Sequence, residues 1–300
     1  YADAKSELEK VISSGKYDLI ADVSTFYHPA SAGCKEYVLE CVRHYDPSNM
    51  YSQEGWFGIL ANWGFGYGFI AGPEASLHYK FNTTSGYSYF NPSKSLYDAF
   101  VAEEGADGYR LNAWIRTWEQ VIAMNIAVNT TTNKYASEGY FRLKWLASTD
   151  DEFVGYWCGN QSNTPVIRYA DVLLMAAEAC LQAGYQAGAD EYLGSVRDRA
   201  RLPRKSHVTL SDIKLERRLE LAMEGMRFQD LKRWGDAPAV LADKGKKLPT
   251  FQIVPDPNNE LATEAGIYNA RYTNKTTHVD NAKSLEGWHP KSDERAPCSE

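Results

Sequence analysis

Residues 51–92 are rich in aromatic and amide side chains, which are the side chains in this sequence best suited to binding a ligand. The segment has seven glycines and little periodicity, which predicts a long loop region. Aromatic faces stack on the C–H faces of sugar rings, and amide groups hydrogen-bond to hydroxyls. The alternative is that these rings pack the loop onto its scaffold. The candidate ligand-binding residues are Trp56, Trp63, Tyr67, Tyr79, Tyr87, Tyr89, Asn62, Asn82 and Asn91.

Groups that could catalyse a reaction are harder to find. The six histidines include no HExxH pair, and the sequence contains no GxSxG. Glu103, Glu104 and Asp107 could supply paired carboxylates for glycosidic cleavage, but acids at a helix end are ordinarily solvated. We therefore expect a protein that is not an enzyme and has no cofactor. A Ca²⁺ site built from loop carboxylates and carbonyl oxygens stays open, although no EF-hand spacing supports it.

Composition excludes two classes of protein. The formal net charge of −7 argues against a nucleic-acid surface, which needs a basic footprint. No run approaches the ~20 apolar residues of a membrane span, and the chain does not open on a signal peptide. The five cysteines have no zinc-ligand spacing. Cys180 is expected to be a buried thiol, and whether Cys34 and Cys41 form a disulfide stays open.

Residues 165–243 carry the strongest helical pattern, with apolar residues at three- and four-residue steps. Pro165 suits the start of a first helix, and Gly184 suits its end. A second helix is expected over 188–200. The apolar positions of a third helix continue to Met226. Its N-cap candidates are Thr209, Ser211 and Asp212.

The charges of this helical block are unusual. Glu178 falls on an apolar helix face, where an isolated carboxylate would be costly. Glutamates also recur at a four-residue step of like charge, which needs compensation. Because arginine pairs well with carboxylates, we expect a semi-buried ion-pair lattice that pins the helices together in a structural role. Its expected members are Glu178, Arg217, Glu220, Glu224, Arg227, Asp230 and Arg233.

Outside this block the pattern predicts shorter elements. The expected elements are a helix over 2–14, a short strand within 36–45, a helix over 93–103, and strands near 112–127 and 139–147. The tail from residue 244 is rich in Pro, Asn and Lys and is expected to be mostly irregular.

The helical block contains the motifs RYADVLLMAAEA, SVRDRARLP and ERRLELAMEGMRFQDLKRWG. Together they resemble the C-terminal region of the SusD/RagB family of nutrient-binding outer-membrane lipoproteins of Bacteroidetes. The opening YADAKSELEKVISSGKYDLIAD and the stretch NPSKSLYDAF, followed by GADGYR, are also similar to that family. The resemblance implies a mainly α, SusD-like fold, in which tetratricopeptide-type helical hairpins carry long aromatic loops and minor β structure.

The resemblance also implies how the chain is organised. We expect residues 1–300 to be the C-terminal portion of a single SusD-like domain, without the N-terminal helical half and its lipid anchor. Within that portion the expected regions are 1–50 (helix and turn), 51–160 (loop-rich and ligand-binding), 165–243 (helical block) and 244–300 (irregular tail).

The function that the resemblance implies is non-catalytic binding of glycans at the cell surface. Such a protein passes its oligosaccharide to a SusC-type TonB-dependent transporter and is held at the outer membrane only through its lipid anchor. A second hypothesis is a helical-repeat scaffold that binds a protein or peptide partner. The glycine-spaced aromatic segment favours the first, because a scaffold alone has little use for it.

Overall fold

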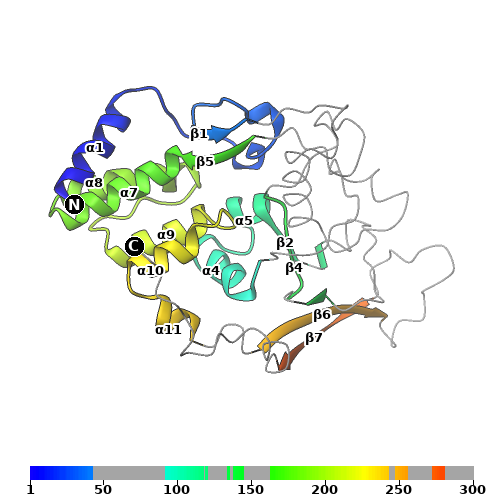
Figure 1. The fold of residues 1–300 in the computed structure, drawn as a ribbon. Helices are drawn as coiled ribbons and strands as arrows, with labels where there is room; N and C mark the ends of the chain where they lie inside the picture. The colour runs from blue at the N-terminus through cyan, green and yellow to red at the C-terminus, as the bar shows by residue number, and fades with distance from the viewer. Residues whose placement is uncertain are drawn as a thin grey trace, which may run out of the picture.

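The computed structural model describes residues 1–42, 92–117, 119–120, 134–135, 138–144, 163–242, 247–255 and 272–280. Helices dominate this part of the chain, and two antiparallel strand pairs and one three-stranded sheet accompany them in the described residues (Figure 1). This arrangement confirms the expected mainly α fold with minor β structure. The predicted region boundaries near residues 50, 160 and 244 lie at or next to residues outside the described ones and stay predictions.

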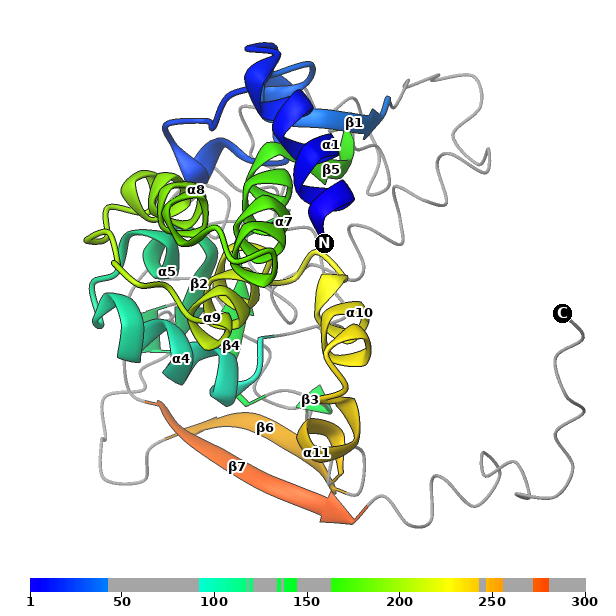
Figure 2. The same ribbon diagram turned by 90° about the vertical axis from the view of Figure 1, so that its left-hand side faces the viewer.

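Helix α7 (Tyr169–Gln182) lies at the centre of the helical block. It packs against α1 (Ala2–Ser13), α8 (Gln186–Arg199) and α9 (Leu210–Glu220), and Figure 2 shows α7 between α1 and α8. The helix ends where predicted, because Gly184 adopts a positive φ of 77° and lets the chain turn back into α8. Helices α7 and α8 thus form the expected helical hairpin.

The predicted start of this first helix at Pro165 is wrong. Pro165 lies in strand β5 (Thr164–Arg168), which pairs antiparallel with β1 (Tyr37–Cys41). The β-branched neighbours of the proline favour an extended chain, and a two-stranded sheet tolerates a proline that donates no hydrogen bond. The helix begins only after Arg168, and the strand therefore delivers that arginine to the first turn of α7.

The third predicted helix is two helices. Helix α9 starts with a capping box between Thr209 and Asp212, as the N-cap candidates suggested, but it ends at Glu220. Met223 and Gly225 then adopt positive φ angles of 65° and 81°, which an α-helix does not accommodate. The chain restarts as α10 (Met226–Arg233) and continues to α11 (Ala237–Leu241).

The middle of the chain also differs from the expectation in one place. Helix α4 (Lys94–Glu104) follows its N-cap Ser93 as predicted. The strand expected from residue 112 is instead the end of α5 (Tyr109–Trp114) followed by β2 (Ile115–Thr117). Strand β2 pairs with β4 (Tyr140–Arg142), which lies where the second strand was expected.

The tail contains more β structure than predicted. Strands β6 (Lys247–Pro255) and β7 (Tyr272–Asp280) pair antiparallel along their whole length, and β3 (Lys134–Tyr135) joins β6. The three threonines of β7, together with Tyr272 and Val279, favour an extended strand, and the polar composition of the tail concealed this signal. In the described part of the chain, no helix has both the length and the apolar composition that crossing a bilayer requires.

Two hydrophobic cores meet at α9. One gathers aromatic residues of the N-terminal region and α5, including Phe26, Trp114 and, from α9, Leu219. The other lies between α7, α8 and α9 and includes Ile213 of α9. Helix α9 therefore links both cores, and the polar residues between its apolar positions lie where the two cores meet.

Candidate functional site

The centre of the molecule is a charge network in which Glu220 of α9 accepts hydrogen bonds from three arginines. Its carboxylate lies 3.0 Å from Arg110 Nη1 and 3.0 Å from Arg168 Nη2, and it also forms a short ion pair with Arg199. These side chains are at most 4% exposed. Because the three arginines come from α5, the end of β5 and α8, a single carboxylate connects three elements.

Glu36 extends this network to the N-terminal region. Its carboxylate lies 2.5 Å from Arg168 Nη1 and 3.1 Å from Arg199 Nη1. It also accepts a hydrogen bond of 2.6 Å from the backbone N–H of Ile20. Both arginines are therefore shared by Glu36 and Glu220, and they hold the turn before β1 against α8 and α9.

The carboxylates that resembled a catalytic pair are part of the same network. Glu104 lies 2.6 Å from Arg110 Nε, and Glu103 lies 2.6 Å from Arg197 Nη1. Glu216 connects the two arginines, at 2.5 Å from Arg110 and 3.0 Å from Arg197. Both glutamates are therefore held by arginines. Burial outweighs Arg110 and raises the pKa of Glu104, whereas Arg197 and Lys205 outweigh burial and lower the pKa of Glu103.

Lys144 closes the network at the C-terminal end of α9. Its ammonium group lies 2.5 Å from Glu224 Oε1 and 3.8 Å from the centre of the Trp114 ring. It also donates to the backbone carbonyls of Glu220 at 3.0 Å and Ala222 at 3.2 Å. These carbonyls have no partner inside the helix, and a lysine at this end satisfies them and complements the helix dipole.

The charges balance in the buried part of this network, which we call the central charge network. Glu103, which is 16% exposed, lies at its edge and also pairs with Lys205. In the described part of the chain, five basic and five acidic side chains, each at most 10% exposed, form one connected set of ion pairs. They are Arg110, Lys144, Arg168, Arg197 and Arg199 with Glu36, Glu104, Glu216, Glu220 and Glu224. A buried charge is tolerated when it is paired in this way.

Burial and pairing shift the ionisation of this network in different directions. Burial alone would raise the pKa of Glu220, but its three arginines outweigh burial and hold that pKa well below its usual range. The pKa of Glu224 is also lowered, because Arg168 and Lys144 outweigh burial. At Glu36, burial dominates over its two arginines and raises the pKa. Burial lowers the pKa of Lys144 to about 8, with Glu224 acting in the opposite direction.

A second cluster, the α10 cluster, joins α7, α9 and α10. Arg217 lies 2.6 Å from Asp171 Oδ1 and 2.9 Å from Asp230 Oδ2. Arg233 lies 2.9 Å from Asp230 Oδ1 and holds Glu178 in a bidentate pair at 2.5 and 2.7 Å. Glu178 also accepts a hydrogen bond of 3.0 Å from the indole N–H of Trp234, and this explains how a carboxylate sits on an apolar helix face.

The structure therefore divides the expected lattice. Glu220 and Glu224 lie in the central charge network, and four other members lie in the α10 cluster. Arg227 differs from the expectation, because no ion pair joins it to any residue that the structure describes. The left-handed turn at Met223 and Gly225 resets the helix phase before α10, so Arg227 faces away from the carboxylates of α9.

Sequence reasoning missed most of the central charge network, because the predicted lattice contained only Glu220 and Glu224 of its ten members. Glu36, Arg110 and Lys144 precede the helical block, and nothing in the sequence indicates that they pair with it. Arg197 and Arg199 could have been found from the pattern, because they lie between the apolar residues Val196 and Ala200 at the end of α8. The signal that could have predicted these residues is the number of arginines at positions that the helical periodicity assigns to the buried face of the helix.

The predicted ligand-binding residues lie outside the described residues. They are Trp56, Trp63, Tyr67, Tyr79, Tyr87, Tyr89, Asn62, Asn82 and Asn91, and their roles stay predictions. The described residues contain no group of three or more His, Cys, Asp or Glu side chains placed to hold a metal ion. The possible Ca²⁺ site in the loops stays a prediction. Cys34 and Cys41 are free thiols, and Cys180 is buried, with its pKa raised by burial.

Comparisons with known proteins identify the family. A model of the SusD family matches residues 35–297. A SusD-like protein of Bacteroides ovatus is 43% identical over 75 residues, which are 24% of this chain and 14% of that protein. SusD-like protein P38 of Formosa agariphila is 36% identical over 157 residues, which are 47% of this chain and 28% of that protein.

Solved structures show the same fold. A laminarin-binding SusD-like protein is 30% identical with a TM-score of 0.61, and the match covers 77% of this chain and 48% of that chain. The chain thus spans about half the length of that structure and less of the curated relatives it matches. With the family match extending over most of its length, the chain belongs to the SusD family.

Proposed function

We propose that this protein binds glycans at the cell surface, without cleaving them, and delivers them to a SusC-type TonB-dependent transporter of the outer membrane. The observation that carries the proposal is the family match over residues 35–297, together with the similarity to a laminarin-binding SusD-like protein. Family membership also supports attachment to the outer membrane through an N-terminal lipid anchor.

The proposed division of labour follows from the chemistry of the two parts. The ligand contacts are assigned to the aromatic segment, where rings such as Trp63 and Tyr87 stack on sugar faces and amides such as Asn62 orient the hydroxyls. Stacking on several successive rings lets affinity accumulate along an oligosaccharide. The central charge network is assigned the role of a brace, because its carboxylates are held by arginines and have no place for a substrate.

The single most informative experiment is calorimetric titration with laminarin oligosaccharides and with other polysaccharide fragments. Trp63→Ala and Tyr87→Ala are expected to weaken binding by about fivefold each, since a stacked aromatic ring contributes on the order of 1 kcal/mol. Phe228→Ala is the matched control, because Phe228 is an exposed aromatic residue on α10, far along the chain from the aromatic segment.

Two outcomes would count against parts of this proposal. Unchanged affinity in both aromatic variants, with glycan binding intact in the wild type, would remove the site assignment. Failure to bind any glycan would favour the alternative, a helical scaffold for a protein or peptide partner. Reducing-end detection after long incubation with glycan checks the non-catalytic part, and release of new reducing ends would contradict it.

A further inference from the structure

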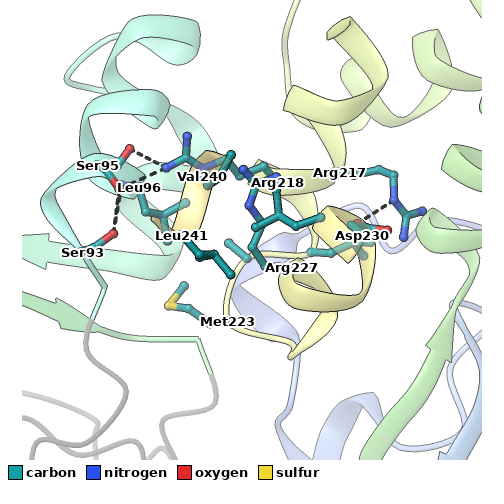
Figure 3. Close-up of a pocket in the computed structure, with 13 residues that line it drawn as sticks. Ser93, Ser95, Leu96, Arg217, Arg218, Met223, Arg227, Asp230, Val240 and Leu241 are labelled. Atoms are coloured by element: carbon teal, nitrogen blue, oxygen red, sulfur yellow. Dashed lines mark hydrogen bonds and ion pairs between the residues drawn. The ribbon is translucent and has the colours of Figure 1, made fainter. Parts of the chain in front are cut away.

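A pocket of about 570 Å³ lies beside the α10 cluster, where α4, α9, α10 and α11 meet (Figure 3). Ser95 and Val240 are exposed, so the pocket opens to solvent between α4 and α11. Its size is in the range of roughly 300–1,000 Å³ that small-molecule sites occupy. Apolar side chains make up most of its described walls. They are Leu96, Leu221, Ala222, Met223, Leu231, Val240 and Leu241.

Arg218 and Arg227 bring positive charge to these apolar walls, and neither has a carboxylate partner among the residues that the structure describes. Arg218 donates to the backbone carbonyl of Ser95 at 2.9 Å and to its hydroxyl at 3.2 Å, both uncharged acceptors. Arg227 makes no ion pair with the described part of the chain. Figure 3 shows both arginines at the pocket, on α9 and α10.

The carboxylates near the pocket are already engaged. Asp230 is the acidic residue among the described lining residues, and both its oxygens are held, by Arg217 and Arg233 at 2.9 Å each. Asp236, whose charge also reaches Arg227, lies 2.6 Å from the ammonium group of Lys214. Neither aspartate is therefore free to turn towards Arg227 without giving up an existing ion pair.

The pocket consequently has a surplus of positive charge. Three arginines line it against one aspartate among the described residues. Burial lowers the pKa of Arg218, and the charge of Arg227 lowers it further. Two partly buried like charges side by side are unfavourable unless an anion neutralises them.

We propose that this pocket binds an organic carboxylate with an apolar body. The planar guanidinium groups suit the two oxygens of a carboxylate, and the walls around Leu96, Met223 and Leu241 suit an aliphatic or aromatic body. A highly charged anion such as a polyphosphate does not match these walls, because it would lose its hydration against apolar side chains. The proposal does not depend on glycan binding, and either can fail without the other.

Calorimetric titration with hexanoate tests the proposal, with hexanamide as the uncharged analogue of the same shape. The wild-type chain is expected to bind hexanoate at least tenfold more tightly than hexanamide. Arg227→Gln is expected to remove most of that difference, and its melting temperature should stay close to that of the wild type, because Arg227 holds no described ion pair. Lys232→Gln is the matched control, since Lys232 is exposed on the same helix and does not line the pocket.

The comparison of hexanoate with hexanamide tests the proposed carboxylate preference in the wild-type protein, without any variant. Equal affinities for both ligands, or no heat from hexanoate at millimolar concentration, would overturn the proposal. Equal hexanoate affinity in Arg227→Gln and Lys232→Gln would do the same. Galacturonate carries its carboxylate on a polar ring and therefore tests whether the ligand needs an apolar body. It is expected to bind more weakly than hexanoate. Tighter binding of galacturonate would contradict the proposed apolar body of the ligand.

Discussion

Arg217 and Arg218 are adjacent in the sequence, but the fold places them in two different environments. Arg217 is 2% exposed and lies between two aspartates, at 2.6 and 2.9 Å. Arg218 lines the pocket, and its hydrogen-bond partner in the described part of the chain is the uncharged Ser95. A rotation of about 100° per residue around α9 is enough to separate a residue that connects helices from one that leaves its charge available.

The difference shows how a charge-rich helix block can combine rigidity with binding capacity. In the central charge network and the α10 cluster, each buried arginine meets carboxylates from other elements, so the charges fix the relative positions of the helices. In the pocket, Arg218 and Arg227 have no such partner among the described residues. Removing a charge should therefore have a large effect on stability in the first environment and a small one in the second.

The largest effect is expected for Glu220→Gln. The substitution keeps the shape of the side chain but leaves Arg110, Arg168 and Arg199 around a neutral group, and loss of one partner from a buried ion pair typically costs about 3–5 kcal/mol. Urea denaturation should show a loss of about 3 kcal/mol or more in the free energy of unfolding.

Glu191→Gln is the control for that measurement. Glu191 pairs with Arg204 at 2.7 Å, but their side chains are 59% and 45% exposed. An exposed pair contributes about 0–1 kcal/mol, because water screens the charges. A Glu220→Gln variant as stable as Glu191→Gln would mean that the central charge network does not hold the helices together.

A smaller but more direct contrast is expected between Arg217→Met and Arg218→Met. The first removes a shared cation from Asp171 and Asp230 and should lower the free energy of unfolding by about 2–3 kcal/mol. The second removes an arginine that is half-buried and repelled by Arg227, so the expected change is within about 1 kcal/mol in either direction. Thermal or urea unfolding of the two variants side by side measures the contrast, and equal losses would contradict it.

Much of the fold could be predicted from the sequence because its signals are local. The end of α7 at Gly184 and the start of α9 at Thr209 depend on residues within one turn of the helix boundary. The errors arose where local signals compete. Pro165 suits a helix start and also an edge strand, and the pairing with β1 that decides between them involves residues more than a hundred positions away.

The charge clusters were less predictable for a related reason. A helical pattern shows that Glu178 and Glu220 face inward, but it does not name their partners. Arg110 precedes Glu220 by 110 positions, and Glu36 precedes Arg168 by 132. The pocket was not predicted at all, because it depends on the restart of the chain at Gly225, which moves Arg227 to a new face.

The smallest expected effect is the change in the free energy of unfolding at acid pH that is due to Glu220 alone. Its folded-state pKa lies below the usual 4.5, so the unfolded chain takes up a proton at a higher pH than the folded protein does. Its contribution to stability is therefore present above about pH 4.5 and decreases as the pH falls further, by at most about 1.4 kcal/mol per pH unit. Glu36, with a raised pKa, acts in the opposite direction, so the whole-protein curve does not report Glu220 alone.

The comparison of wild type with Glu220→Gln removes this ambiguity, because Glu36 is present in both proteins. Between pH 4.5 and pH 3.5 the stability gap between them should narrow by about 1 kcal/mol, measured by urea denaturation at each pH. Parallel curves would mean that Glu220 is protonated in both states, or in neither, over this range. Its arginines would then not be the groups that keep it ionised, and the contrast with the pocket arginines would lose its electrostatic basis.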